Sequence, residues 1–293
     1  MDDNENQDQS DKPSQRKPLK WNSPEHNPEE FRLSLVEHLE ELRTRIIRSF
    51  LIVMVFWVIA WLNFSKIFNF LTDRASSAIN AVLVPKGQKY SEIILHIPDA
   101  FMMVFKFSFF CALIAAFPFI VMQLWGFIAP GLKPEEQKPL KRIGPISLLL
   151  FVLGGLFCWL VLPAAFGWFA DYLDYFPGVA LTQEAGTMAM FSLKSILAFG
   201  IGFQLPLVVF VLGALNLLSS ATLLKYWRHA AVAIFFISGA ITPSNDIPTM
   251  MMMAIPLTIL FMISAYAVKI VQRNKKPSDF VIAPDAEESK YDD

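Results

Sequence analysis

Four stretches of the chain are long and apolar enough to cross a bilayer as helices. A membrane helix needs about 20 apolar residues, because each residue adds about 1.5 Å and the hydrocarbon layer is roughly 30 Å thick. Hydrophobic residues dominate Ile46 to Phe64, Phe107 to Ile128, Ile143 to Ala170 and Ser195 to Leu218. Each stretch is therefore predicted to be a transmembrane helix, and the third has residues to spare for tilt.

Two further apolar stretches lie closer to the C-terminus. Met250 to Val268 just reaches the required length. Ala230 to Thr242 offers only about 13 residues, or roughly 20 Å of helix. Either its flank at Tyr226 to His229 reaches the interface, or the bilayer thins beside it. The pattern thus predicts an all-α membrane protein with six spans, of which the last two are short.

The placement of Lys and Arg predicts the orientation of the spans. Basic residues mark the side of the membrane that faces the cytosol. They cluster before the first span, between the second and third, between the fourth and fifth, and after the sixth, at Arg43, Arg45, Arg48, Lys138, Lys141, Arg142, Lys225, Arg228, Lys269 and Arg273. The outward segment Ser65 to Pro98 also carries basic residues and is the exception. Both termini are therefore expected in the cytosol.

Composition supports a lipid environment and excludes one class of function. Hydrophobic residues make up 54% of the 293 residues, and the net charge is -1. A chain without an excess of positive charge lacks the basic surface by which proteins attract nucleic acid. The membrane domain is predicted to comprise residues 34–271, between a polar, disordered cytosolic tail at 1–33 and a cytosolic tail at 272–293.

An amphipathic helix is predicted just before the first span. Ser34 and Glu37 have the spacing of a capping box, and Leu35, Leu39 and Leu42 follow at helical spacing. Glu41 lies on the polar face of this helix. It has a structural explanation as the partner of Arg45, although an exposed pair of this kind contributes only about 0.3–0.5 kcal/mol. A ligand-binding role for Glu41 is the alternative.

A second polar segment follows the second span, from Phe127 to Glu136. Pro134 suits the first position of a short helix, where Glu135 and Glu136 would favour the positive end of its dipole. Binding of a cationic ligand is again the alternative to this structural role.

These motifs resemble those of the TatC family of twin-arginine protein translocases. The N-terminal signature is His38-Leu-x-Glu41-Leu-Arg43, and the first cytosolic loop carries Phe127-x-x-Pro130-Gly131-Leu132 followed by Glu136. Matches continue in the order of the family up to Val271. The residues of these later matches are Pro118, Gln123, Phe199, Gly200, Pro206, Thr242, Pro243, Asp246 and Pro256. Of the matching residues, Pro118, Gln123, Pro130, Gly131 and Pro206 are expected to be structural.

The resemblance implies a receptor and core scaffold in the bacterial plasma (inner) membrane. In this family, acids of the two cytosolic regions receive the paired arginines of a folded cargo's signal peptide. The carried-over acids are Glu41 and Glu136, with Arg43 and Phe127 in the same signal-peptide-binding set. A guanidinium fits a carboxylate bidentately, so two arginines need two acceptors. The implied partners are TatA- and TatB-type single-span proteins and further copies of the chain in a receptor complex. The proton motive force is the implied energy source, without catalysis, metal or cofactor.

Two positions depart from the family pattern. Gln204 stands in the fourth span where many relatives have Glu, and Met250 stands where relatives often have Gln. Gln204 is either a docking point for a partner's transmembrane helix or a helix-packing residue within the chain. Partner docking is also expected at the outward turn formed by Thr242, Pro243 and Asp246.

Two functions of other classes are alternatives to the receptor. A secondary transporter for a small solute would need polar groups near the bilayer midplane, and that region is almost entirely apolar. An intramembrane serine protease would need a base beside Ser238, but His229 lies about 13 Å away along the same helix. The receptor is therefore the predicted function, with the solute transporter as the alternative.

Overall fold

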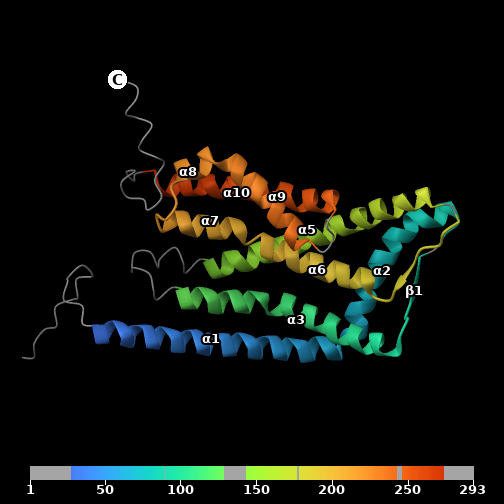
Figure 1. Ribbon diagram of the computed structural model, residues 1–293, viewed down its shortest axis with the longest axis horizontal. Coiled ribbons are helices and arrows are strands. Elements are labelled where there is room, and N and C mark those ends of the chain that lie inside the picture. Colours follow the sequence, from blue (N-terminus) through green and yellow to red (C-terminus); the bar gives the residue numbers. More distant parts are fainter. Residues whose placement is uncertain (1–27, 89, 129–142, 177, 243–245, 274–293) are drawn as a thin grey trace, which may run out of the picture. The chain divides into compact units, whose positions relative to one another are not determined.

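The computed structural model describes residues 28–88, 90–128, 143–176, 178–242 and 246–273, and side chains from residue 38 onward. The chain forms two units, residues 1–42 and 43–293. Helix α1, Pro28–Leu62, belongs to both. Within the second unit the long helices lie side by side (Figure 1).

Helices make up almost all of the described structure, which agrees with the predicted fold class. After α1 they are α2 (Phe64–Leu83), α3 (Ile97–Ile128), α5 (Ile143–Asp171), α6 (Thr187–Gly202), α7 (Leu205–Ala214), α8 (Ser220–Lys225), α9 (Trp227–Ile241) and α10 (Ile247–Val271). Single 3-10 turns follow α2 at Val84–Lys86 and α5 at Tyr172–Tyr175. The two strands are β1 (Ser91–Ile93) and β2 (Thr182–Glu184).

The described residues contain five helices long and apolar enough to cross a membrane, together with the shorter apolar helix α9. These six match the six predicted spans. Helix α9 has 15 residues, so it is about 22 Å long and shorter than an ordinary hydrocarbon layer. Helix α10 has 25 residues and extends beyond its predicted bounds at both ends. Of the last two spans, the fifth is therefore much the shorter.

The fourth span is two helices. Helix α6 ends at Gly202, and α7 begins at Leu205 with Pro206 in its first turn. A proline inside a continuous helix lacks the N–H for the ladder and crowds the carbonyl four residues earlier. Pro118, in contrast, lies within the uninterrupted α3. The break brings Gln204 to the N-cap position of α7, in the middle of the span.

Helix α1 begins earlier than predicted. Its first residue is Pro28, and proline is favoured at the first helical position because its missing N–H has no partner there. Ser34 therefore lies inside the helix, and the predicted capping box at Ser34 is wrong. The amphipathic helix does run into the first span without interruption, as predicted.

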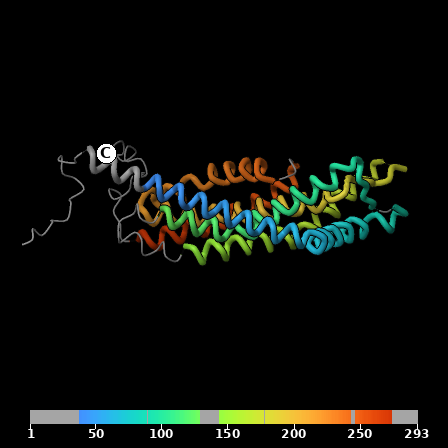
Figure 2. Tube along the Cα trace, turned by 90° about the horizontal axis from the view of Figure 1, so that it is seen from below, coloured from blue at the N-terminus to red at the C-terminus, as the bar shows by residue number. Residues whose placement is uncertain are grey.

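The outward segment between the first two spans forms a helix that the sequence analysis did not predict. Helix α2 leaves the end of α1 and runs across the bundle at the same end as both strands (Figures 1 and 2). Its buried residues are Leu71, Ala75, Ile79 and Leu83, four apart along one face. This stripe packs against α5 and α6, so α2 covers the outward end of the membrane helices.

The two strands tie the outward loops together. They pair in parallel with Glu92 opposite Gln183, and the backbone N–H of Gly186 donates to the Glu92 carboxylate at 3.3 Å. Tyr90 donates its hydroxyl proton to the same carboxylate at 2.7 Å. Burial, and then this hydrogen bond, raise the pKa of Tyr90 above its usual value. The hydroxyl thus keeps its proton and remains a donor.

Small residues allow α5 and α6 to approach closely. A Cβ atom at Gly154 would lie 2.6 Å from the carbonyl oxygen of Phe199, and one at Gly200 would meet the Phe151 ring. Close contact of this kind is a main source of cohesion between helices in lipid, where the hydrophobic effect gives no preference for helix over lipid. The α5–α6 contact is the most extensive pairing of helices in the described structure.

We therefore predict that Gly154→Ala destabilises the protein and that Gly155→Ala does not. The added methyl at position 154 would collide with backbone, which cannot move away as a side chain can. A methyl at position 155 would lie 3.5 Å from Ile196 Cγ2, an ordinary contact. Unfolding in detergent should show a loss of about 1–3 kcal/mol for Gly154→Ala. Equal stability of the two variants would contradict the proposed close packing.

Candidate functional site

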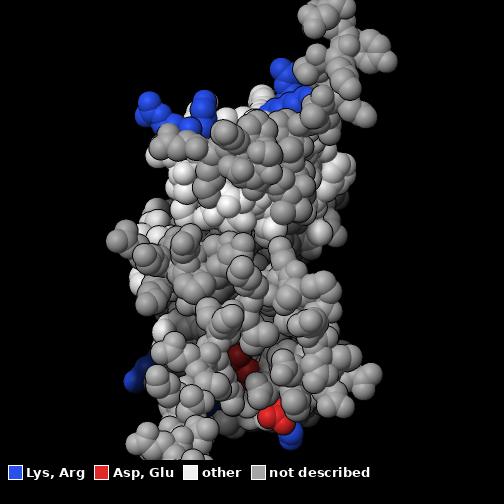
Figure 3. All heavy atoms as spheres, turned by 90° about the vertical axis from the view of Figure 1, so that its left-hand side faces the viewer, with Lys and Arg blue, Asp and Glu red and all other residues white. Residues whose placement is uncertain are grey.

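Basic side chains of the second unit mark its cytosolic end. Figure 3 looks onto this end, where Lys and Arg side chains lie at the edges of the described surface. Lys225 lies in the last turn of α8 and Lys269 in the last turn of α10. Helix α3 ends and α5 begins at the same end of the molecule (Figure 1). The charge distribution is that of a membrane protein with this end in the cytosol.

The Glu41 carboxylate is accessible on helix α1. Its side chain is 32% exposed, and its Oε2 lies 3.8 Å from Nδ1 of His38, one turn earlier. At this distance and exposure, the pair is loose and screened by water. Arg43, two residues further along the helix, is exposed. Glu41 is therefore placed where a ligand from the aqueous phase can reach it.

The second predicted acid has no described position. Glu136 lies in residues 129–142, outside the described structure, together with Pro130 and Gly131. Phe127 is described, half-buried in the last turn of α3. The structure thus describes the positions of Glu41 and Phe127, and the position of Glu136 lies outside the described residues.

Arg45 holds the start of the first span against α3. Its Nη1 donates to the backbone carbonyl of Gln123 at 3.4 Å, and its guanidinium lies directly over Gly126. Any side chain at position 126 would displace it. This contact was not predicted, because the sequence indicated Arg45 as a partner for Glu41 and as one of the basic residues before the first span. The sequence feature that could have indicated a close contact here is Gly126, a glycine within the last turns of an apolar helix.

Gln204 makes its hydrogen bonds within the chain. The Ser147 hydroxyl on α5 donates to Gln204 Oε1 at 2.5 Å, and Gln204 Nε2 donates back to the Ser147 carbonyl at 3.1 Å. A reciprocal pair of this kind joins α5 to the break between α6 and α7. The observation favours the helix-packing role for Gln204, and its role in docking a partner helix stays a prediction.

Local hydrogen bonds hold the start of α10, which follows the outward turn. Asp246 is the N-cap of α10, and its carboxylate accepts from the Thr249 N–H at 2.9 Å and from the Thr249 hydroxyl at 2.8 Å. Thr242 is buried at the end of α9. Pro243 lies outside the described residues. Asp246 thus has a structural role that would persist whether or not a partner binds there.

A double-mutant cycle would measure the pair formed by Gln204 and Ser147. Gln204→Leu and Ser147→Ala each leave a polar group without its partner. The double variant should therefore lose less unfolding free energy than the sum of the losses in the two single variants. Unfolding in detergent should give a coupling of about 0.5–1.5 kcal/mol. Ser192→Ala, which removes only a bond to the Met188 carbonyl in the same helix, is the control and should show no coupling to Gln204. A coupling near zero for Ser147 would contradict the assigned pairing.

Comparison with known proteins identifies the family. The model of the Sec-independent protein translocase protein (TatC) family matches residues 37–256. A Sec-independent protein translocase protein TatC from Carboxydothermus hydrogenoformans is 32% identical over 251 residues, which cover 85% of this chain and 96% of that relative. The TatC of Desulforapulum autotrophicum is 34% identical over 256 residues, covering 86% and 89%.

A solved structure agrees with these relatives. The crystal structure of a twin arginine translocase receptor, TatC, superposes with a TM-score of 0.63 at 30% identity, and the match covers 80% of this chain and 100% of that one. The family model spans the Glu41 motif, the Phe127 to Glu136 segment and the broken fourth span. The chain therefore belongs to the TatC family, as a multi-pass inner-membrane component of the Tat protein translocase that transports proteins and is not an enzyme.

Proposed function

We propose that this chain is the signal-peptide receptor and core scaffold of its translocase. The observation that carries the proposal is the accessible Glu41 carboxylate on α1, within the motif that the family model covers. The related crystal structure bears the description of a twin arginine translocase receptor. In the proposal, Glu41 and Glu136 each accept one arginine of the signal peptide in a bidentate pair. Arg43 and Phe127 complete the proposed signal-peptide-binding set.

The proposed recognition is electrostatic and selective for arginine. A lysine ammonium is a point charge and cannot match both oxygens of a carboxylate as the planar guanidinium does. Because the site lies at the wet face of the membrane, ions in solution would screen it. Binding should therefore weaken when salt is added or when lysines replace the arginine pair.

Charge reversal tests the two acids directly. Glu41→Lys combined with Glu136→Lys should lower the affinity of membranes containing the full translocase for a twin-arginine precursor by at least about tenfold, since each lost pair is charge-assisted. Glu40→Lys, an exposed position beside Glu41, is the matched control and should lose much less. Unchanged precursor binding and export in the double variant would show that these residues are not the acceptors.

The proposal includes docking of TatA- and TatB-type single-span subunits, assembly with further copies of this chain, and use of the proton motive force. Helix α9 presents exposed apolar side chains at Val232, Phe236 and Ile237, a surface that lipid or a partner helix would cover. Docking is proposed at Thr242, Pro243 and Asp246, of which Thr242 follows the outward end of α9 and Asp246 precedes α10. At Gln204 a partner helix would have to share an amide that already bonds Ser147.

The proposed function also includes a role for the short fifth span in thinning the bilayer. A helix of 15 residues spans about 22 Å, so the bilayer beside it should thin and present a lower barrier to a passing cargo.

Lengthening α9 tests this idea. Insertion of one apolar turn of about four residues after Ile234 should impair export and leave signal-peptide binding intact. Precursor transport and precursor binding are measured in the same membranes. The same four residues inserted after Lys275, beyond the spans, serve as the control. Normal export with the longer α9 would count against local thinning.

A further inference from the structure

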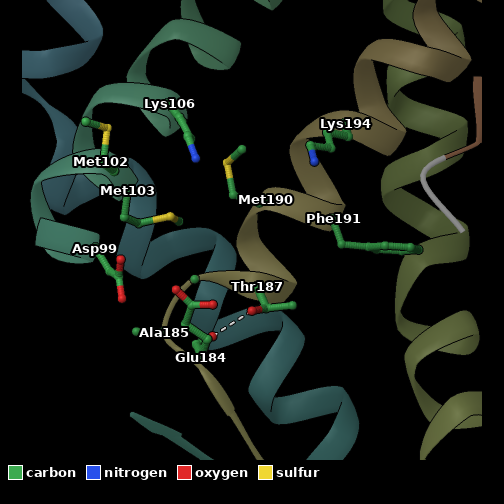
Figure 4. A pocket seen from close by; sticks show the side chains of 11 residues that line it. Asp99, Met102, Met103, Lys106, Glu184, Ala185, Thr187, Met190, Phe191 and Lys194 are labelled. Atoms are coloured by element: carbon green, nitrogen blue, oxygen red, sulfur yellow. Dashed lines mark hydrogen bonds between the residues drawn. The ribbon is translucent and has the colours of Figure 1, made fainter. Parts of the chain in front are cut away.

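A pocket of about 390 Å³ opens at the outward end of the molecule between the beginnings of α3 and α6. Figure 4 shows its lining side chains, which come from these two helices and from the end of β2. Its walls are apolar at Met102, Met103, Met190 and Phe191. All the residues that line the pocket belong to the second unit, and none of them is in the proposed signal-peptide-binding set.

Two lysines from different helices point into this pocket. Lys106 on α3 and Lys194 on α6 face each other across its opening, with Met190 between them (Figure 4). In the described part of the chain, neither ammonium forms a salt bridge with a carboxylate. Lys194 Nζ lies 5.8 Å from the Phe110 ring centroid. Two ammonium groups beside apolar side chains at a membrane surface favour an anionic partner.

The lysines lie at the depth of the outer headgroups. Lys106 comes immediately before the apolar run Phe107 to Ile128, and Lys194 immediately before Ser195 to Leu218. Both therefore stand at the outward boundary of the hydrocarbon. Snorkelling alone would let each ammonium turn separately to the water. It does not account for two lysines that converge on one pocket.

Two acids line the opposite, more outward end of the pocket. Asp99 lies in the first turn of α3 and Glu184 at the end of β2, at the far side of the pocket from the lysines (Figure 4). Asp99 Oδ2 is 2.9 Å from Nδ1 of His96. Asp99 precedes Lys106 by seven residues of helix, or about 10 Å. Charge is thus ordered along the membrane normal, with cations toward the hydrocarbon and anions toward the water.

We propose that this pocket binds a phospholipid of the outer leaflet whose headgroup carries a phosphate and a primary ammonium, as in phosphatidylethanolamine. The phosphate would lie between Lys106 and Lys194, and the ammonium, which extends further from the membrane, between Asp99 and Glu184. The acyl chains would extend from the pocket along α3 beside Met102, whose side chain is exposed. The charge order in the pocket matches the order in which such a lipid presents its groups.

Native mass spectrometry of the full chain in detergent, titrated with defined lipids, tests the proposal. Phosphatidylethanolamine should bind better than phosphatidylcholine, whose quaternary ammonium donates no hydrogen bonds, and better than anionic phosphatidylglycerol, which the two acids repel. Lys106→Gln combined with Lys194→Gln should weaken phosphatidylethanolamine binding about tenfold. Lys66→Gln, which removes an exposed lysine of α2 outside the pocket, should leave it unchanged.

The acid side of the pocket gives an independent readout. Glu184→Gln should reduce the preference for phosphatidylethanolamine over phosphatidylglycerol without abolishing phospholipid binding. Equal phosphatidylethanolamine binding by wild type and the double lysine variant would overturn the site. Tighter binding of phosphatidylglycerol would overturn the assignment of a zwitterionic headgroup, and displacement of the lipid by millimolar inorganic phosphate would assign the pocket to a soluble anion instead.

Discussion

Hydrocarbon offers no hydrogen-bond partners, so the backbone N–H and C=O groups of the spans have to be satisfied within the protein. The fourth span shows how this constraint organises the structure. Pro206 ends the continuous helix, and the polar side chains around the break bond to neighbouring helices. Gln204 and Ser147 pair reciprocally, and the Ser264 hydroxyl on α10 donates to the Pro206 carbonyl at 2.5 Å. The break thus becomes the point at which α5 and α10 are tied to the fourth span.

The same constraint explains the cytosolic end of this helix group. The buried Gln272 amide donates to the carbonyls of Gly213 at 2.6 Å and Leu218 at 2.9 Å, and its oxygen accepts from the Ser220 N–H at 2.8 Å. One side chain therefore satisfies the end of α7, the following turn and the start of α8. Sequence reasoning placed Gln272 in a polar tail, because one amide after an apolar run carries no signal of three distant backbone partners.

Hydropathy and basic loops predicted the six spans and their orientation, because length and charge are local properties of the chain. Helix α2 was not predicted, although Leu71, Ala75, Ile79 and Leu83 repeat every four residues. Polar residues separate these apolar ones, so the segment contains no long apolar run. The pairing of β1 with β2 joins residues 91 positions apart, Ser91 with Thr182. No local pattern predicts such a pairing. At the proposed cytosolic site, family motifs point to Glu41, whose role stays a prediction, whereas the contact of Arg45 with Gly126 depends on how α1 packs on α3.

The central claim is that Glu41 contacts the arginine pair of the signal peptide. Its most direct test is site-specific photocrosslinking from position 41 to a twin-arginine precursor in membranes that contain the complete translocase. The account predicts a crosslink to the segment carrying the two arginines, which is lost when both are replaced by lysine. A crosslink of equal yield with the lysine precursor, or none with the arginine precursor, would contradict it.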